Sequence, residues 1–131
     1  MAVDYEYIPC AKTAKILKQV LQRSFPGTKF SVVSDMSAWS ASILVSYRGG
    51  PSHQEVSQIA RQYSGGGFDG MIDEHYSRYA YLDDDGIVHG HDSEGTAAYR
   101  GSVQPVHDPQ PPGTRKVQFG ATYVHVQPRG E

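Results

Sequence analysis

One amphipathic segment with a sharp ending most constrains how this chain can fold. Apolar residues recur every four positions at Leu17, Leu21 and Phe25, and the charged residues of the segment fall mostly away from that stripe. Such a period is typical of a helix that buries one face. Pro26-Gly27 follows directly, and this pair ends a helix. The pattern therefore predicts a helix over residues 11–25.

Two segments that alternate apolar and polar side chains follow this helix. They span residues 29–34 and 41–48, and a short polar connection that carries the only tryptophan, Trp39, lies between them. Two runs of this kind on either side of a short loop predict an antiparallel hairpin. Gly49-Gly50-Pro51 then ends the second strand.

A second helix is indicated by the chemistry of its first turn. Ser52 and Glu55 have the spacing of a capping box, in which each side chain accepts a hydrogen bond from the backbone N–H of the other residue. An apolar stripe follows, and three successive glycines at 65–67 end the helix. Residues 11–73 are thus expected to form a helix–strand–strand–helix core. We expect residues 71–73 to start one more short strand or helix.

The second half of the chain adds strands but has weaker patterns. Residues 79–82 and 87–91 flank an Asp-Asp-Asp-Gly turn, which predicts a second hairpin. Residues 93–115 are rich in Gly, Pro, Ser and Gln and have no period, so they predict a long loop. Residues 117–126 predict one final strand with a bulge.

These elements predict one domain of the α+β class over residues 1–131. Two helices are expected to pack on one face of an antiparallel sheet. The strands of residues 79–131 are expected to complete that sheet, since a strand that follows a long loop normally returns to an existing one.

The composition limits the function and the compartment. Twelve Lys and Arg residues against 14 Asp and Glu residues give a net charge of −2, which argues against a general nucleic-acid-binding surface. The single cysteine, Cys10, fits a reducing compartment, and a buried, unreactive thiol is favoured over a nucleophile. The first residues lack the features of a signal peptide, and no apolar run approaches the length of a membrane span. We expect a soluble, cytoplasmic protein that makes no membrane contact.

Several motifs in the first half resemble one family of α+β modules. They are Phe25-Pro26-Gly27-Thr28-Lys29-Phe30-Ser31-Val32, Ser42-Ile43-Leu44-Val45-Ser46-Tyr47, Gly50-Pro51 and Gly67-Phe68-Asp69-Gly70-Met71-Ile72-Asp73. The family is the twenty-ninth of the large polyvalent-protein-associated domains, which occur in giant proteins of phages and conjugative elements and also as short proteins. The resemblance covers about residues 11–73 and leaves the tail after Tyr79 outside.

The resemblance implies an accessory module of a mobile element that protects or establishes foreign DNA in a host. It assigns no catalytic residue to this chain. Members often have Trp and then an acidic residue after the second strand, where this chain has Tyr47 and Arg48.

Protein recognition is the function that these features favour. Nine tyrosines against four phenylalanines is a mild excess, and tyrosine is enriched in recognition surfaces. We expect a non-enzymatic interaction module without a cofactor, whose partner is a host or element protein of a defence or nucleic-acid-processing system. The candidate partner-binding residues are Trp39, Tyr47, Arg48, Tyr76 and Tyr79.

A nucleic-acid-binding accessory domain is an alternative function. Cationic side chains along one side of the first helix, with one on the hairpin, would contact phosphates, and aromatic rings would stack on bases. An ordinary solvated helix face explains the same residues and is favoured. The candidate nucleic-acid-binding residues are Lys12, Lys15, Lys18 and Lys29.

A metal-dependent hydrolase is the third hypothesis. Asp69, Asp73 and His75 lie close together in the sequence near a glycine-rich turn and would supply metal ligands and a general base. An Asp69 that caps a tight turn is the favoured interpretation. His89 and His91 are a second potential metal pair, because alternate residues of a strand share a face.

Overall fold

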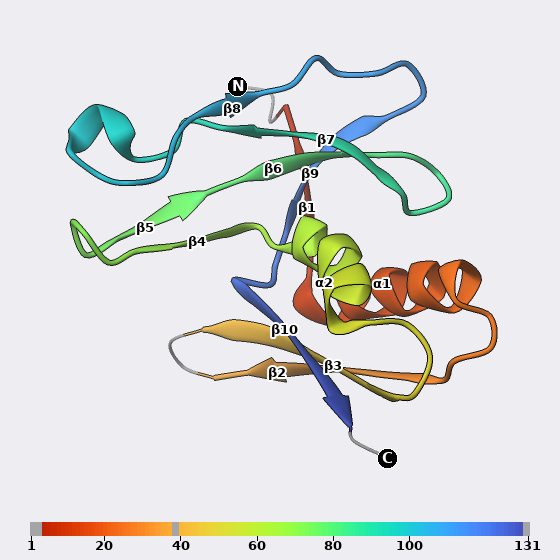
Figure 1. Cartoon of the computed structure of the whole chain (residues 1–131). Coiled ribbons are helices and arrows are strands. Elements are labelled where there is room, and N and C mark those ends of the chain that lie inside the picture. Colours follow the sequence, from red (N-terminus) through yellow and green to blue (C-terminus); the bar gives the residue numbers. More distant parts are fainter. Residues whose placement is uncertain (1–3, 38–39, 130–131) are drawn as a thin grey trace.

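The computed structural model describes residues 4–37 and 40–129, and in this part of the chain two α-helices lie between two sheets (Figure 1). The larger sheet has the strand order β1-β9-β6-β7-β8, the smaller has the order β10-β3-β2, and β4 and β5 form a separate two-stranded sheet. The helices are α1 (Cys10–Ser24) and α2 (His53–Ala60), with 3₁₀ turns η1 (Arg61–Tyr63) and η2 (Ala97–Tyr99). The strands are β1 (Glu6–Ile8), β2 (Phe30–Met36), β3 (Ala41–Arg48), β4 (Gly66–Asp69), β5 (Glu74–Ser77), β6 (Tyr79–Leu82), β7 (Val88–Ser93), β8 (Val106–His107), β9 (Arg115–Phe119) and β10 (Tyr123–Arg129).

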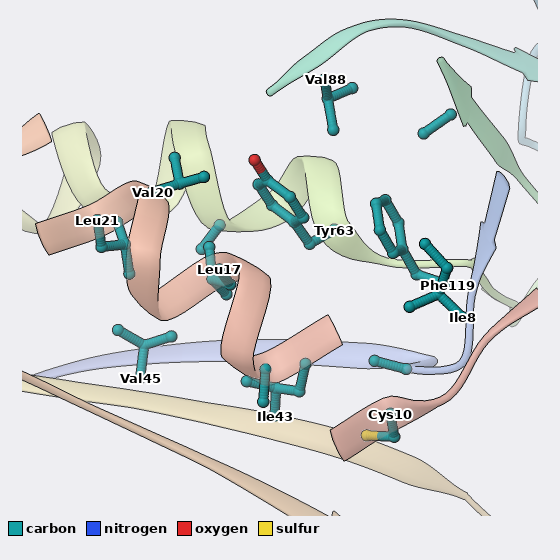
Figure 2. Packing of buried hydrophobic residues seen from close by; sticks show 14 of the residues in the cluster. Ile8, Cys10, Leu17, Val20, Leu21, Ile43, Val45, Tyr63, Val88 and Phe119 are labelled. Atoms are coloured by element: carbon teal, nitrogen blue, oxygen red, sulfur yellow. The ribbon is translucent and has the colours of Figure 1, made fainter. Parts of the chain in front are cut away.

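The first helix lies at the centre of the hydrophobic core. The predicted helix is present and begins one residue earlier than expected, at Cys10. Leu17 and Leu21 are fully buried, and they belong to one cluster with Ile43 and Val45 of β3. Figure 2 shows these strand residues on one side of α1 and Tyr63 on the other. Burial of each leucine contributes about 1.5–3 kcal/mol.

The second helix starts with the predicted capping box. The backbone N–H of Glu55 donates to the hydroxyl of Ser52 at 3.1 Å, and the backbone N–H of Ser52 donates to the Glu55 carboxylate at 2.8 Å. Two orphan donors of the first turn are thereby satisfied. Val56, Ala60 and Tyr63 then bury the core-facing side of α2 and η1.

The predicted hairpin is also present, as β2 paired antiparallel with β3. Phe30 lies opposite Tyr47, and both are buried, so these two rings face the helices. Because successive side chains of a strand point to opposite faces, the residues beside them point away from the helices.

The prediction of a single antiparallel sheet is wrong, because the described strands form three sheets, although both helices lie on one face of the β10-β3-β2 sheet. The two hairpins belong to different sheets, with the helices between them. The expected final strand over residues 117–126 is two strands. The first, β9, pairs antiparallel with β6 and parallel with β1, whereas β10 pairs parallel with β3.

Three residues between β9 and β10 carry the chain from one sheet to the other. The backbone N–H of Gly120 donates to Ile8 at 2.7 Å, and that of Thr122 donates to Ala41 at 2.8 Å, so neighbouring residues bond to different sheets. A Cβ on Gly120 would lie 2.6 Å from the Tyr7 hydroxyl and 2.9 Å from the Ile8 carbonyl oxygen. The crossover therefore requires glycine at this position. This crossover divides the strand predicted over residues 117–126 into β9 and β10.

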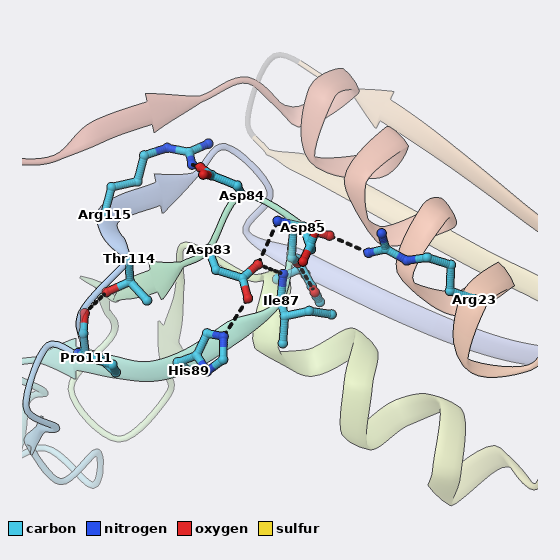
Figure 3. Close-up of polar contacts among 11 residues, drawn as sticks. Arg23, Asp83, Asp84, Asp85, Ile87, His89, Pro111, Thr114 and Arg115 are labelled. Atoms are coloured by element: carbon cyan, nitrogen blue, oxygen red, sulfur yellow. Dashed lines mark hydrogen bonds and ion pairs between the residues drawn. The ribbon is translucent and has the colours of Figure 1, made fainter.

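The acidic turn between β6 and β7 fastens the larger sheet to the helices (Figure 3). The Asp83 carboxylate accepts from the backbone N–H of Asp85 at 2.8 Å and of Ile87 at 3.0 Å. Arg23 of α1 donates to the Asp85 carbonyl, and the Tyr63 hydroxyl donates to the Gly86 carbonyl at 2.5 Å. The acidic run thus forms a structural turn that docks on α1 and η1.

Two further predictions are corrected. Residues 71–73 form a turn between β4 and β5, in which Asp73 has a φ of 53°, and they start no strand or helix. The expected loop over residues 93–115 contains η2 and β8. Neither η2 nor β8 was predicted, because two or three residues are too few to show a period.

Candidate functional site

The face of the β10-β3-β2 sheet that points away from the helices is the candidate functional site. Buried residues of β3, such as Ile43 and Val45, define the inner face, and the residues between them point outward. In Figure 1 the helices lie on the inner side of this sheet. We call the outward-pointing strand residues, together with Lys29 just before β2, the outer sheet face; the strand residues are Ser31, Val33, Asp35, Ser42, Leu44, Ser46, Arg48, Tyr123, His125 and Gln127.

An exposed apolar row crosses the middle of the outer sheet face. Val33 pairs with Leu44, and Leu44 pairs with His125, so one side chain from each strand contributes to the row. Val33 is 54% exposed and Leu44 is 38% exposed. Tyr123 is 37% exposed and stacks on His125, with ring centroids 6.1 Å apart. Adjacent exposed apolar residues of this kind are typical of an interaction surface.

A cationic hollow lies beside this row, further along β2 and β3. It is lined by Lys29, Ser31, Ser46 and Arg48 together with Phe30 and Tyr47, and no Asp or Glu of the described residues lines it. Among the described residues, neither Lys29 nor Arg48 makes an ion pair. Both charges are therefore available to an acidic group that approaches the outer sheet face.

The structure distributes the predicted partner-binding residues over several surfaces. Arg48 is exposed on the outer sheet face, whereas Trp39 lies outside the described residues. Tyr76 lies half-buried on β5. Tyr79 lies on β6, and the centroid of its ring is 4.8 Å from that of the Tyr5 ring and 4.9 Å from the Lys116 Nζ.

Burial removes Tyr47 from the candidate contact residues. It is 4% exposed, and its ring lies 5.4 Å from that of Phe30 on the inner face. Burial raises the pKa of Tyr47, and its hydroxyl has no hydrogen-bond partner within the described part of the chain. Strand alternation explains the difference from Arg48, its neighbour, which points outward.

The predicted nucleic-acid-binding lysines are all exposed but do not share one surface hollow. Lys12, Lys15 and Lys18 lie on α1, and Lys12 lines a hollow together with the acidic residues 83–85. Lys29 lines the separate hollow beside Arg48. Carboxylates next to Lys12 oppose the approach of a phosphate there.

The potential hydrolase residues are used in a different way. Asp69 is 2% exposed, and its carboxylate accepts hydrogen bonds from the Thr96 hydroxyl, the backbone N–H of Ser102 at 2.7 Å, and that of Met71 at 2.9 Å. These bonds, the one from Thr96 above all, lower the pKa of Asp69 to about 2. The His75 ring packs against the Phe68 ring, with the ring centroids 5.1 Å apart.

No group of three or more His, Cys, Asp or Glu residues that could hold a metal ion occurs within residues 4–37 and 40–129. Asp69, Asp73 and His75 therefore form no such group there. His89 and His91 also bind different partners, the Asp83 carboxylate at 2.7 Å and the Gln62 carbonyl at 3.3 Å.

A bulge separates these two histidines. Val88 pairs with Leu82, but His91 pairs with Ala80, so β7 has one more residue than β6 between the two pairs. The extra residue breaks the alternation on which their shared face depended.

Cys10 is the first residue of α1 and is 3% exposed. Its Sγ lies 3.6 Å from the Ser42 carbonyl oxygen, and burial raises the pKa of the thiol. A raised pKa lowers the fraction of reactive thiolate, which fits the interpretation of a buried thiol.

Comparison with known proteins identifies one family. The chain matches the family described as large polyvalent protein associated domain 29 over residues 8–128. The match includes the C-terminal region, so the family extends well beyond residue 73, where the sequence motifs had placed its end. No curated protein and no solved structure matches the chain. Among the described residues, no helix has the length and apolar character needed to cross a membrane.

Proposed function

The chain belongs to the large polyvalent protein associated domain 29 family, and we propose that it is a non-enzymatic module that binds a protein partner through its outer sheet face. The observation that carries this proposal is the exposed row of Val33, Leu44 and His125 across three paired strands. A phage or mobile-element origin, with a partner in a host defence or nucleic-acid-processing system, completes the proposal.

The chemistry of the outer sheet face defines the partner that would fit. An apolar side chain of the partner would cover Leu44 and Val33, which removes apolar surface from water. An acidic group beside it would meet Lys29 and Arg48, and this charge complementarity would fix the orientation. The partner is thus expected to present an apolar residue flanked by Asp or Glu.

The roles of two reactive side chains support a binding function over catalysis. Within the described part of the chain, the Asp69 carboxylate accepts hydrogen bonds from Met71, Thr96 and Ser102, and these bonds fasten a turn. Cys10 is buried with a raised pKa. Both groups therefore support structure.

Affinity capture with matched variants tests this proposal. The wild-type protein, Leu44→Glu and Tyr99→Glu are each used to capture partners from a lysate of the cells that encode the protein, with and without nuclease. Tyr99 is 78% exposed and lies on η2, outside the outer sheet face, so it controls for loss of an exposed apolar residue. Equal thermal midpoints of the three proteins establish that each is folded.

The proposal predicts one protein that is recovered by the wild type and by Tyr99→Glu, but lost with Leu44→Glu, whether or not nuclease is present. Recovery that persists with Leu44→Glu would contradict the role of the outer sheet face. Recovery that disappears after nuclease treatment would favour the nucleic-acid-binding alternative.

A further inference from the structure

A second surface feature, the groove between β10 and the β4–β5 hairpin, has an unusual charge pattern. Its volume is about 340 Å³, within the usual range for sites that bind small ligands. Among the described residues, its lining includes Arg61, Arg78 and His125, which can carry positive charge, and no Asp or Glu. Three aromatic residues, Phe68, Tyr76 and Tyr123, also line the groove.

The backbone holds the guanidinium of Arg78 in one orientation. Its Nη2 donates to the Arg61 carbonyl and to the Ser64 carbonyl at 3.3 Å, and its Nε lies 3.4 Å from the same Ser64 oxygen. These carbonyls follow the end of α2, where the helix dipole favours a cation. The remaining nitrogen, Nη1, has no hydrogen-bond acceptor in the described part of the chain, so two N–H donors of a fixed fork are unused.

Within the described part of the chain, the cations of this groove lack a counter-ion, as Lys29 and Arg48 do, whereas two other cations of the chain are paired. Arg115 donates to the Glu6 carboxylate at 2.8 Å, and Lys116 donates to Asp92 at 2.8 Å. In residues 4–37 and 40–129, by contrast, no carboxylate pairs with Arg61, Arg78 or His125. The groove therefore concentrates unneutralised positive charge in a chain whose net charge is −2.

We infer that this groove binds a phosphoryl group that is attached to a nucleobase-bearing carrier. The Arg78 Nη1 and the Arg61 guanidinium would donate hydrogen bonds to phosphoryl oxygens, because the planar arginine fork matches phosphate geometry. Burial lowers the pKa of Arg78, but arginine stays charged in proteins, and partial burial strengthens its attraction to an anion.

Exposed rings in the groove would contact the base. Phe68 is 43% exposed and Tyr123 is 37% exposed, and an aromatic ring can stack on any base. A free nucleotide and a single-stranded nucleic acid present the same chemistry, and the experiment below separates these two sources.

This inference is independent of the proposed protein-binding function. The groove adjoins the outer sheet face and shares Tyr123 and His125 with it, but Arg61 belongs to the groove alone and Leu44 to the outer sheet face alone. Variants at these two positions therefore separate the two proposals.

Three probes test the inference on the full chain: inorganic pyrophosphate, AMP and a fluorescent eight-nucleotide oligo(dT). Isothermal titration measures the first two, and fluorescence anisotropy at several salt concentrations measures the third. Arg61 is exposed, so Arg61→Glu should fold normally, and Lys15→Glu makes the same charge change at an exposed position on α1. Equal thermal midpoints of both variants without ligand confirm that the comparison is valid.

The inference predicts that AMP or oligo(dT) binds, and that Arg61→Glu weakens this binding at least tenfold whereas Lys15→Glu and the uncharged change Leu44→Ala alter it less than twofold. Binding of AMP and pyrophosphate without oligo(dT) identifies a free nucleotide as the source. Binding of oligo(dT) that falls steeply with salt identifies a strand. The absence of binding by all three probes at millimolar concentration overturns the inference, as does an equal loss with Lys15→Glu and Arg61→Glu.

Discussion

The Asp69 carboxylate accepts a hydrogen bond of 2.7 Å from the backbone N–H of Ser102, which lies 33 residues further along the chain. The hydroxyl groups of Thr96 and Ser102 donate to the same carboxylate. A Cβ on Gly101 would lie 2.4 Å from an Asp69 oxygen, so the loop approaches this carboxylate as closely as glycine allows. One buried acid thus fastens the turn after β4 to the segment around η2.

Asp69→Asn should lower the thermal stability at pH 7, because an amide cannot accept all of these hydrogen bonds. The pKa of Asp69 is lowered from 3.8 to about 2 in the folded protein, so the ionised carboxylate stabilises the fold above about pH 4. That contribution is lost as the pH falls through 2. Thermal midpoints followed by circular dichroism should differ between wild type and variant by several degrees at pH 7, and the difference should shrink toward pH 2. A difference that does not depend on pH would contradict this role.

Gly120→Ala should destabilise the crossover between the sheets. The new Cβ would lie 2.6 Å from the Tyr7 hydroxyl and 2.9 Å from both the Cys10 nitrogen and the Ile8 oxygen. We expect a loss of roughly 1–3 kcal/mol in the free energy of unfolding, measured in urea. Gly27→Ala is the matched control, since no atom of the described residues lies within 4 Å of its Cβ position, and it should change stability by less than about 0.5 kcal/mol. Equal effects of the two substitutions would refute the steric explanation.

Leu21→Ala should create a cavity in the core around α1. Leu21 is fully buried in the cluster that joins α1 to the larger and the smaller sheet, so the expected loss of unfolding free energy is about 2–5 kcal/mol. Val33→Ala removes apolar atoms from a side chain that is 54% exposed, and it should cost less than about 1 kcal/mol. Urea titrations of both variants measure the two losses of unfolding free energy. A smaller loss for Leu21→Ala than for Val33→Ala would contradict the burial of Leu21 in the core.

Cys10 should resist modification in the folded protein. It is 3% exposed and burial raises the pKa of its thiol, so both access and thiolate concentration are reduced. A chromogenic disulfide reagent at pH 8 should label it at least a hundredfold more slowly in buffer than in 6 M guanidinium, because about 3 kcal/mol of protection slows labelling about a hundredfold. Rapid labelling in buffer would show that the thiol is accessible.

Local chemistry in the sequence was sufficient to predict α1, the start of α2 and the first hairpin. The expected end of the second helix at glycines 65–67 was wrong, because α2 ends at Ala60 and two of these glycines lie in β4. Pro26-Gly27 ends α1, and the Ser52–Glu55 capping box starts α2, since each signal acts within four residues. The strand over Ala41–Arg48 has its predicted bounds because its alternating pattern is complete. The same alternation predicts which residues of β2 and β3 point away from the core.

The sheet partners could not be predicted in the same way. The parallel pairing of Tyr123 with Ser42 depends on a crossover at Gly120, and the requirement for glycine there arises from contacts with Tyr7 and Ile8, over 100 residues earlier. Because the pairing of β10 with β3 was not predicted, the contribution of β10 to the outer sheet face was not predicted either. The groove lined by Arg61 and Arg78 was missed as well, because the fold brings these two residues together through hydrogen bonds from the Arg78 guanidinium to the backbone carbonyls of Arg61 and Ser64.

Photo-crosslinking in the cells that encode the protein tests the outer sheet face most directly. A photoreactive amino acid is placed at position 44 on the outer sheet face or, as a control, at position 99, which is also exposed. Our account predicts a crosslink to one specific protein from position 44 that is absent from position 99. Crosslinking from position 99 but not from position 44, or from neither position, would contradict the proposal that this face binds a protein partner.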